Sequence, residues 1–112
     1  MDKITKYQNI LCDLLNEFGA IKKRLTPNVK AQLIIDKENN HYQLVSVGWH
    51  NAQFVYLVAF HFDIINEKIW IQQNNTDCLI ADELVERGVL PQDIVLGFVS
   101  EGAREQSGFA IA

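Results

Sequence analysis

Four strand-like runs, joined by turns of only a few residues, fill the middle of the chain and limit the folds it can adopt. The runs are separated by polar turns at residues 36–40, 50–53 and 65–68. Each run is rich in β-branched and aromatic side chains, and this alternation of apolar runs and polar turns is typical of successive hairpins. Because each turn is too short for a crossover connection, the simplest arrangement is an antiparallel meander of about four strands.

Helical patterns precede and follow these strands. Apolar residues at spacings of three and four predict a long amphipathic helix over about residues 2–18, beginning at Asp2 and ending at Gly19. A second, shorter helix is expected after the strands, capped by Asn75 or Thr76 and ended by Gly88. The predicted fold class is therefore α+β, with the helices packed on the sheet.

Alternation along the third strand predicts that both faces of the sheet carry apolar side chains. Every second side chain of a strand points to the same face. One face is predicted to hold Phe54, Tyr56, Val58, Phe60 and Phe62, and the other Val55, Leu57, Ala59, His61 and Asp63. Two helices cannot cover both faces, so we expect the C-terminal segment or another subunit to cover the remainder. A large exposed apolar face is uncommon on a monomer, which favours a homo-oligomer.

Composition limits the classes of protein to which the chain can belong. Its 112 residues, 48% of them hydrophobic, are enough for one domain, which we expect to span residues 1–112. The net charge of -4 disfavours direct nucleic-acid binding, because binding to phosphates requires a basic surface. The N-terminus lacks a signal-peptide pattern, and no apolar run is long enough to span a membrane. We therefore expect a cytoplasmic protein in which Cys12 and Cys78 are free thiols.

His61 and Asp63 are the best candidates for chemistry in the chain. They lie on one face of the third strand, about 7 Å apart. A metal site needs a third or fourth ligand, and no sequence pattern brings His41 or His50 to this pair. We interpret the pair as a structural, hydrogen-bonded polar patch and expect no catalytic, cofactor-binding or metal-binding residues. The alternatives are a small metal-dependent hydrolase that uses His61 and Asp63, or a direct DNA-binding module.

Several motifs, in order and at matching spacing, resemble one protein family. They are "HYQLVSVGW" at 41–49, "HFDIINEKIWIQ" at 61–72, "IADELVERGVLPQDIVLGF" at 80–98 and the ending "SGFAIA" behind Arg104. In these motifs the chain resembles the XisI family of small cyanobacterial proteins, known as fdxN element excision controlling factors. The resemblance implies a non-enzymatic accessory protein that acts with an XisH-type, nuclease-like partner. Together they would control a recombinase that excises a DNA element, and no catalytic residues are implied.

The C-terminal segment is the expected interaction surface. Its apolar ending predicts that the tail is docked rather than frayed. The candidate interaction residues are Phe98, Arg104, Ser107, Phe109 and Ile111. We expect Arg104 to pair with a carboxylate from the second helix or from a partner. The chain departs from the family pattern at Val99, Ser100, Glu101 and Ser107. If this loop contacts the partner, these changes would alter the choice of partner or the affinity for it.

Overall fold

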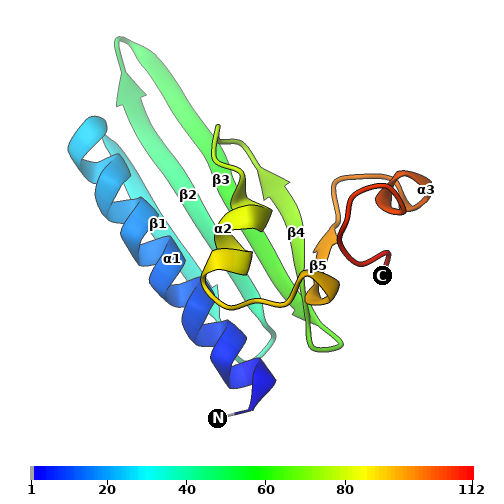
Figure 1. Ribbon diagram of the computed structural model, residues 1–112. Coiled ribbons are helices and arrows are strands. Elements are labelled where there is room, and N and C mark those ends of the chain that lie inside the picture. The colour runs from blue at the N-terminus through cyan, green and yellow to red at the C-terminus, as the bar shows by residue number, and fades with distance from the viewer. Residues whose placement is uncertain (1) are drawn as a thin grey trace.

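The computed structural model describes residues 2–112 and consists of one five-stranded sheet with helices packed on one face (Figure 1). The elements are α1 (Lys3–Leu25), β1 (Val29–Asp36), β2 (His41–His50), β3 (Gln53–Ile65), β4 (Lys68–Asn74), α2 (Ile80–Glu86), a 3-10 turn η1 (Pro91–Asp93), β5 (Ile94–Leu96) and α3 (Glu101–Arg104). The strands follow one another in the order β1-β2-β3-β4-β5. The predicted α+β class and four-stranded meander are confirmed, and β5 adds a short fifth strand parallel to β4.

Helix α1 starts as predicted but continues past its predicted end at Gly19 as far as Leu25. Asp2 accepts a hydrogen bond from the main-chain N–H of Thr5 at 2.7 Å and so caps the N-terminus. Gly19 does not end the helix, because it lies buried against β1, where an added Cβ would meet Leu33 at 3.1 Å. The glycine therefore permits close packing of the helix on the sheet. The helix stops before Pro27, which disfavours helical geometry in the residue before it.

The second helix is shorter than expected and has no side-chain cap. It begins at Ile80 with Leu79 at the N-cap position, so Thr76 and Asn75 do not cap it. Thr76 instead donates its hydroxyl to Asn74 at 2.7 Å and forms part of the turn that follows β4. Gly88 does follow the helix, with a φ of +107° that favours glycine.

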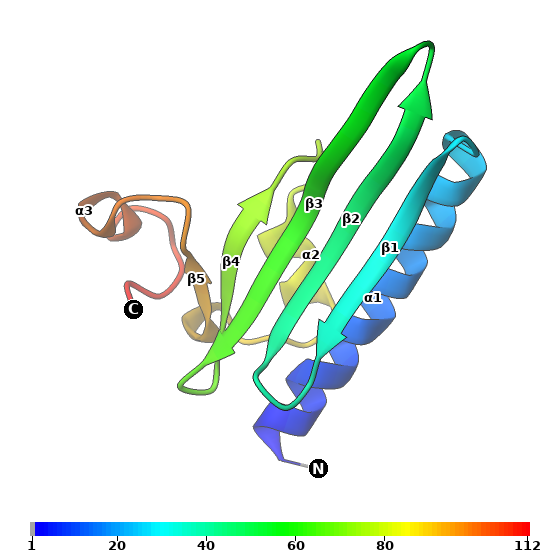
Figure 2. The same cartoon turned by 180° about the vertical axis from the view of Figure 1, so that it is seen from behind.

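The hydrophobic core lies between the two helices and the facing side of the sheet. Leu11 and Leu14 of α1 are fully buried there, as are Leu44 of β2 and Phe60 of β3. The ring of Phe18 packs edge-on against that of Phe60, with centroids 5.2 Å apart. These contacts hold α1 along the sheet and leave the opposite face of β1–β3 without a helix (Figure 2).

A β-bulge in β3 overturns the predicted division of its side chains. Leu44 pairs with Phe60 but its neighbour Val45 pairs with Val58, so Ala59 is an extra residue in β3. An extra residue shifts the two-residue alternation by one, and every side chain beyond it changes face. Phe60 and the Phe62 that follows therefore point to the helices. The three residues predicted to share their face, Phe54, Tyr56 and Val58, point to the other side.

Candidate functional site

A polar cluster forms on the uncovered face of the sheet, where β2 begins and β3 ends. His41 is the cross-strand partner of Asp63. Its Nδ1 lies 2.8 Å from Oδ1 of Asp63, and Nε2 of His61 lies 2.9 Å from the same oxygen. The amide of Gln72 donates to the other oxygen, Oδ2, at 3.2 Å. We call His41, His61 and Asp63 the histidine cluster.

The expectation that His41 would stay apart from His61 and Asp63 is wrong. Near the turn, β2 and β3 pair in a register that, if continued, would place Phe62 opposite His41. The bulge at Ala59 advances β3 by one residue, so Asp63 takes that place instead. The bulge therefore assembles the cluster, and no local sequence pattern marks its position.

Hydrogen bonding within the cluster favours its charged forms. The pKa of His41 is raised, chiefly because its imidazole bonds to Asp63. Partial burial raises the pKa of Asp63, but the hydrogen bonds from His41, His61 and Gln72 outweigh this effect, so its pKa lies below the usual value. The Asp63 side chain is only 13% exposed, whereas that of His41 is 56% exposed. The Asp63 carboxylate is therefore fixed by its hydrogen bonds and largely buried, whereas the His41 imidazole faces the solvent.

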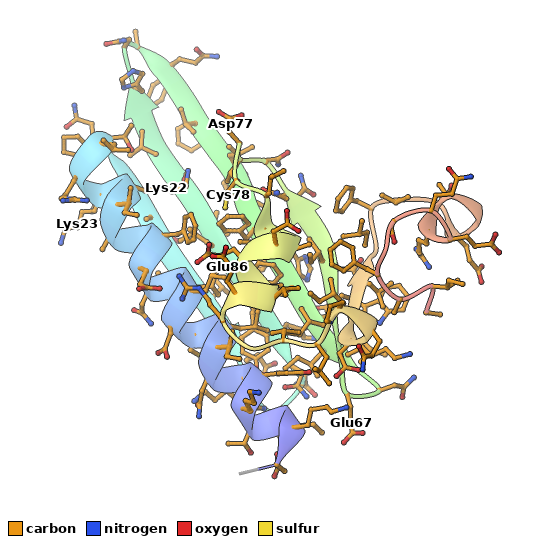
Figure 3. The ribbon with its side chains drawn as sticks, viewed as in Figure 1. Lys22, Lys23, Glu67, Asp77, Cys78 and Glu86 are labelled. Atoms are coloured by element: carbon orange, nitrogen blue, oxygen red, sulfur yellow. The ribbon has the colours of Figure 1, made fainter. Side chains whose placement is uncertain are left out.

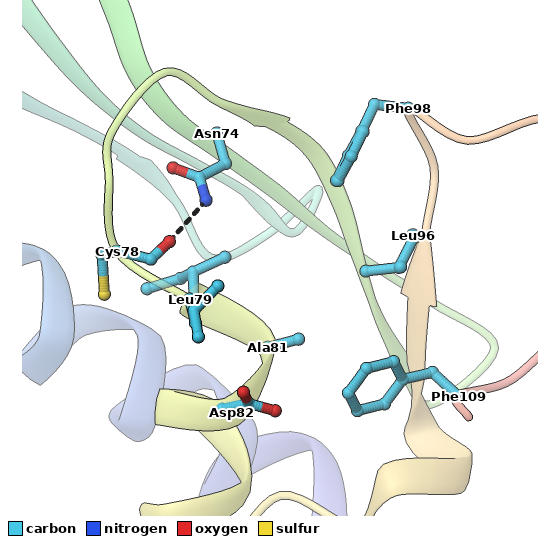
Figure 4. Close-up of a pocket in the computed structure, with 9 residues that line it drawn as sticks. Asn74, Cys78, Leu79, Ala81, Asp82, Leu96, Phe98 and Phe109 are labelled. Carbon is cyan, nitrogen blue, oxygen red and sulfur yellow. Dashed lines mark hydrogen bonds between the residues drawn. The ribbon is translucent and has the colours of Figure 1, made fainter. Parts of the chain in front are cut away.

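A second feature is an apolar pocket of about 210 Å³ near the C-terminal segment. We call it the C-terminal pocket; it is lined by Asn74, Cys78, Leu79, Ile80, Ala81, Asp82, Leu96, Phe98 and Phe109. In Figure 4, Leu96, Phe98 and Phe109 come from the β5 side and face Leu79 and Ala81 at the start of α2. Phe98 and Phe109, both candidate interaction residues, therefore meet in one site. Phe98 is 57% exposed, so its ring is accessible at the surface.

Arg104 has a structural role that the sequence did not reveal. Its Nε donates to the carbonyls of Leu96 and Val99 at 3.1 and 3.0 Å, and its Nη1 donates to that of Ile111 at 3.0 Å. Its guanidinium also lies over the ring of Trp70, 5.1 Å from the centroid. The expected pairing with a carboxylate of α2 is wrong, because Arg104 points to main-chain oxygens instead.

The tail is docked, as its composition predicted. Ala110 donates its main-chain N–H to Ile94 at 2.8 Å and forms a parallel bridge with Val95 of β5. Ser107 accepts from the N–H of Phe109 at 3.0 Å and donates to the carbonyl of Arg104 at 2.7 Å. Ser107 therefore holds the turn that returns the tail to the sheet.

A third feature is the apolar surface on the side of the sheet away from the helices. We call it the open face; its members, placed by the strand register, are Ile34, Val47, Trp49, Phe54, Tyr56 and Val58. The rings of Trp49 and Phe54 pack 5.3 Å apart, and Tyr56 is 70% exposed. The β2–β3 hairpin that carries most of this surface extends past both helices (Figures 1 and 2).

Charged side chains are distributed unevenly over the helical side. Lys22 and Lys23 lie at the end of α1, whereas Asp77 and Glu86 lie at the two ends of the segment that contains α2 (Figure 3). Arg87 joins α1 and α2 through an ion pair with Glu17.

Within residues 2–112, no helix combines the length and the apolar composition needed to cross a membrane.

Comparisons with known proteins agree with this architecture. The model of the family described as XisI protein matches residues 1–111. The crystal structure of a XisI-like protein from Anabaena variabilis is 40% identical, with a TM-score of 0.90, and the match covers 97% of this chain and 99% of that one. The crystal structure of fdxN element excision controlling factor XisI from Anabaena variabilis is 32% identical, with a TM-score of 0.84, and the match covers 99% of this chain and 100% of that one. A search of the curated proteins finds no match. The chain belongs to the XisI family.

Proposed function

We propose that this protein is a non-enzymatic regulatory factor that helps to control excision of a DNA element by binding an XisH-type, nuclease-like partner. The proposal rests mainly on the similarity to the fdxN element excision controlling factor over 99% of the chain. Family membership supports the regulatory role. The choice of partner follows from the family resemblance.

The C-terminal pocket is the proposed docking site for that partner. Its apolar lining includes the exposed side chains of Leu79 and Phe98, and exposed apolar groups in a hollow are suited to anchor a protruding side chain of another protein. Acidic Asp82 lines the pocket, and Asp77 lies in the segment before α2. The chemistry of the pocket therefore fits a partner segment with an apolar anchor flanked by Lys or Arg.

The open face is the proposed site of self-association. Its aromatic side chains lie on a protruding hairpin, and aromatic residues are enriched in the buried centre of protein interfaces. This surface is on the opposite side of the sheet from the helices, so self-association through it leaves α2 accessible.

Phe98→Ser and Tyr56→Ser form a matched pair of variants, because each removes one exposed aromatic ring: Phe98 from the C-terminal pocket and Tyr56 from the open face.

The test is co-expression with an XisH-type protein, followed by quantitative pull-down and sedimentation. Phe98→Ser should weaken partner binding by at least tenfold, which corresponds to about 1.4 kcal/mol, and leave the sedimentation coefficient unchanged. Tyr56→Ser should reduce self-association and leave partner binding unchanged. If the companion does not co-purify with the wild type, the proposed partner is wrong. A salt-dependent affinity for duplex DNA in the isolated protein would instead favour a DNA-binding module.

A further inference from the structure

We propose that the histidine cluster is a binding site for a divalent transition cation of the zinc type. Nδ1 of His41, Nε2 of His61 and a carboxylate oxygen of Asp63 lie within 4.8 Å of one another. Three protein ligands of this kind, with the remaining positions open to solvent, form a recognised class of zinc and iron sites. This inference is independent of the proposed regulatory function.

The three ligand atoms are close enough for a side-chain adjustment to admit a cation. Both imidazole nitrogens now lie 2.8–2.9 Å from the same carboxylate oxygen, in the hydrogen-bonded state. Neighbouring ligands around tetrahedral zinc lie about 3.3 Å apart, since each bond is about 2.0–2.2 Å long. Each nitrogen–oxygen contact would lengthen by about half an ångström, and the two imidazole nitrogens, which lie within 4.8 Å of each other, would close toward about 3.3 Å to surround the ion. His41 can supply this movement, because its side chain is largely exposed.

The donor set selects the class of cation. Imidazole nitrogen suits zinc, cobalt, nickel and iron, whereas calcium and magnesium prefer ligand sets made of oxygen atoms. Oδ2 of Asp63 already accepts a hydrogen bond from Gln72, which orients the carboxylate and leaves Oδ1 to face both imidazoles. Outer hydrogen bonds of this kind are a regular feature of protein metal sites.

The main chain holds the ligands at fixed positions before any ion arrives. His61 and Asp63 lie on β3, and His41 lies on the neighbouring strand β2, directly opposite Asp63. Ladder hydrogen bonds and the bulge fix their register, so binding requires little reordering of the main chain. A bound cation would join the start of β2 to the end of β3.

The chain offers a matched control for the two histidine ligands. His50 is the third histidine and lies at the far end of β2, paired with Gln53 rather than with the cluster. His50→Ala therefore removes an imidazole from the same strand without touching the site. Asp63→Asn keeps the size of the side chain while removing its charge. Cys12 and Cys78 are free thiols, so thiolate binding must be distinguished spectroscopically.

The experiment is calorimetric titration of chelator-treated, tag-free protein with Zn²⁺ and, separately, with Co²⁺. We expect one equivalent per chain and a Co²⁺ spectrum without a thiolate charge-transfer band. His41→Ala, His61→Ala and Asp63→Asn should each weaken binding by at least tenfold, and Gln72→Ala by about tenfold. His50→Ala should bind as the wild type does. Circular dichroism of each metal-free variant checks that the fold is retained.

Three results would overturn the proposal. They are the absence of stoichiometric binding to the wild type, affinity that is unchanged in folded Asp63→Asn, and a thiolate band that shows binding at cysteine.

Discussion

Replacing Tyr7 by Phe tests the main polar contact between the N-terminal helix and the C-terminal third of the chain. Tyr7 is 1% exposed, and its hydroxyl donates to Oδ2 of Asp93 at 2.6 Å. Asp93 is itself buried, and its Oδ2 also forms an ion pair with Nζ of Lys3 at 3.1 Å. A hydrogen bond to a charged group contributes about 1.5–3 kcal/mol. Tyr7→Phe should therefore lower the free energy of unfolding by that amount, because the Asp93 carboxylate keeps only Lys3.

Tyr42→Phe is the matched control. Tyr42 is as buried as Tyr7, but its hydroxyl donates to the neutral side-chain oxygen of Asn40 at 3.0 Å. A hydrogen bond between neutral groups contributes about 0.5–1.5 kcal/mol, so this variant should lose less stability than Tyr7→Phe. Urea unfolding with linear extrapolation gives both values, and an unchanged slope shows that the two transitions are comparable. Equal losses in the two variants would refute the special role of the Tyr7–Asp93 contact.

Three further predictions concern pH, a turn and the tail. Burial raises the pKa of Tyr7 and of Tyr42 from 10.0 to about 12. Both folded-state pKa values exceed the unfolded value, so the stability that the two buried, protonated tyrosines contribute is complete below pH 10 and is lost as the pH rises toward 12. Circular dichroism during an alkaline titration should therefore show unfolding in that pH window. Ala52 has a φ of 64°, so Ala52→Gly should raise the free energy of unfolding by about 0.5–1 kcal/mol, and a lower urea midpoint would contradict this. Arg104→Lys should lower the melting temperature by several degrees despite its retained charge, because Lys cannot reproduce the guanidinium contacts; unchanged melting would show that the charge alone suffices.

The fold was predictable where local pattern determines it. The apolar runs and short turns define β1–β4, and the three- and four-residue spacing defines most of α1. The end of α1 was not predictable, because Gly19 is used for packing against Leu33, a contact between residues distant in sequence. A rule that places glycine at helix ends cannot detect such a contact.

The sites depend still more on tertiary structure. His61 and Asp63 were identifiable from their spacing, but His41 joins them only because Ala59 is inserted in β3. Arg104 was identified as important, yet its partners are main-chain carbonyls, which no side-chain pattern reveals. Sequence therefore identified these side chains but not the contacts that define their roles.

The two edges of the sheet differ in a way that limits how copies of the chain can assemble through strand addition. β5 is three residues long, and its outer side is occupied by the bridge between Val95 and Ala110. β1 has eight residues and lies at the other edge. An exposed edge strand is a template for pairing with another chain. Pairing of β1 with β1 of a second copy would occupy this edge in both chains and give a symmetric pair. Residues 53–57 of β3, which lie before the first pair with β4, offer a second stretch of edge on the same hairpin that carries the open face.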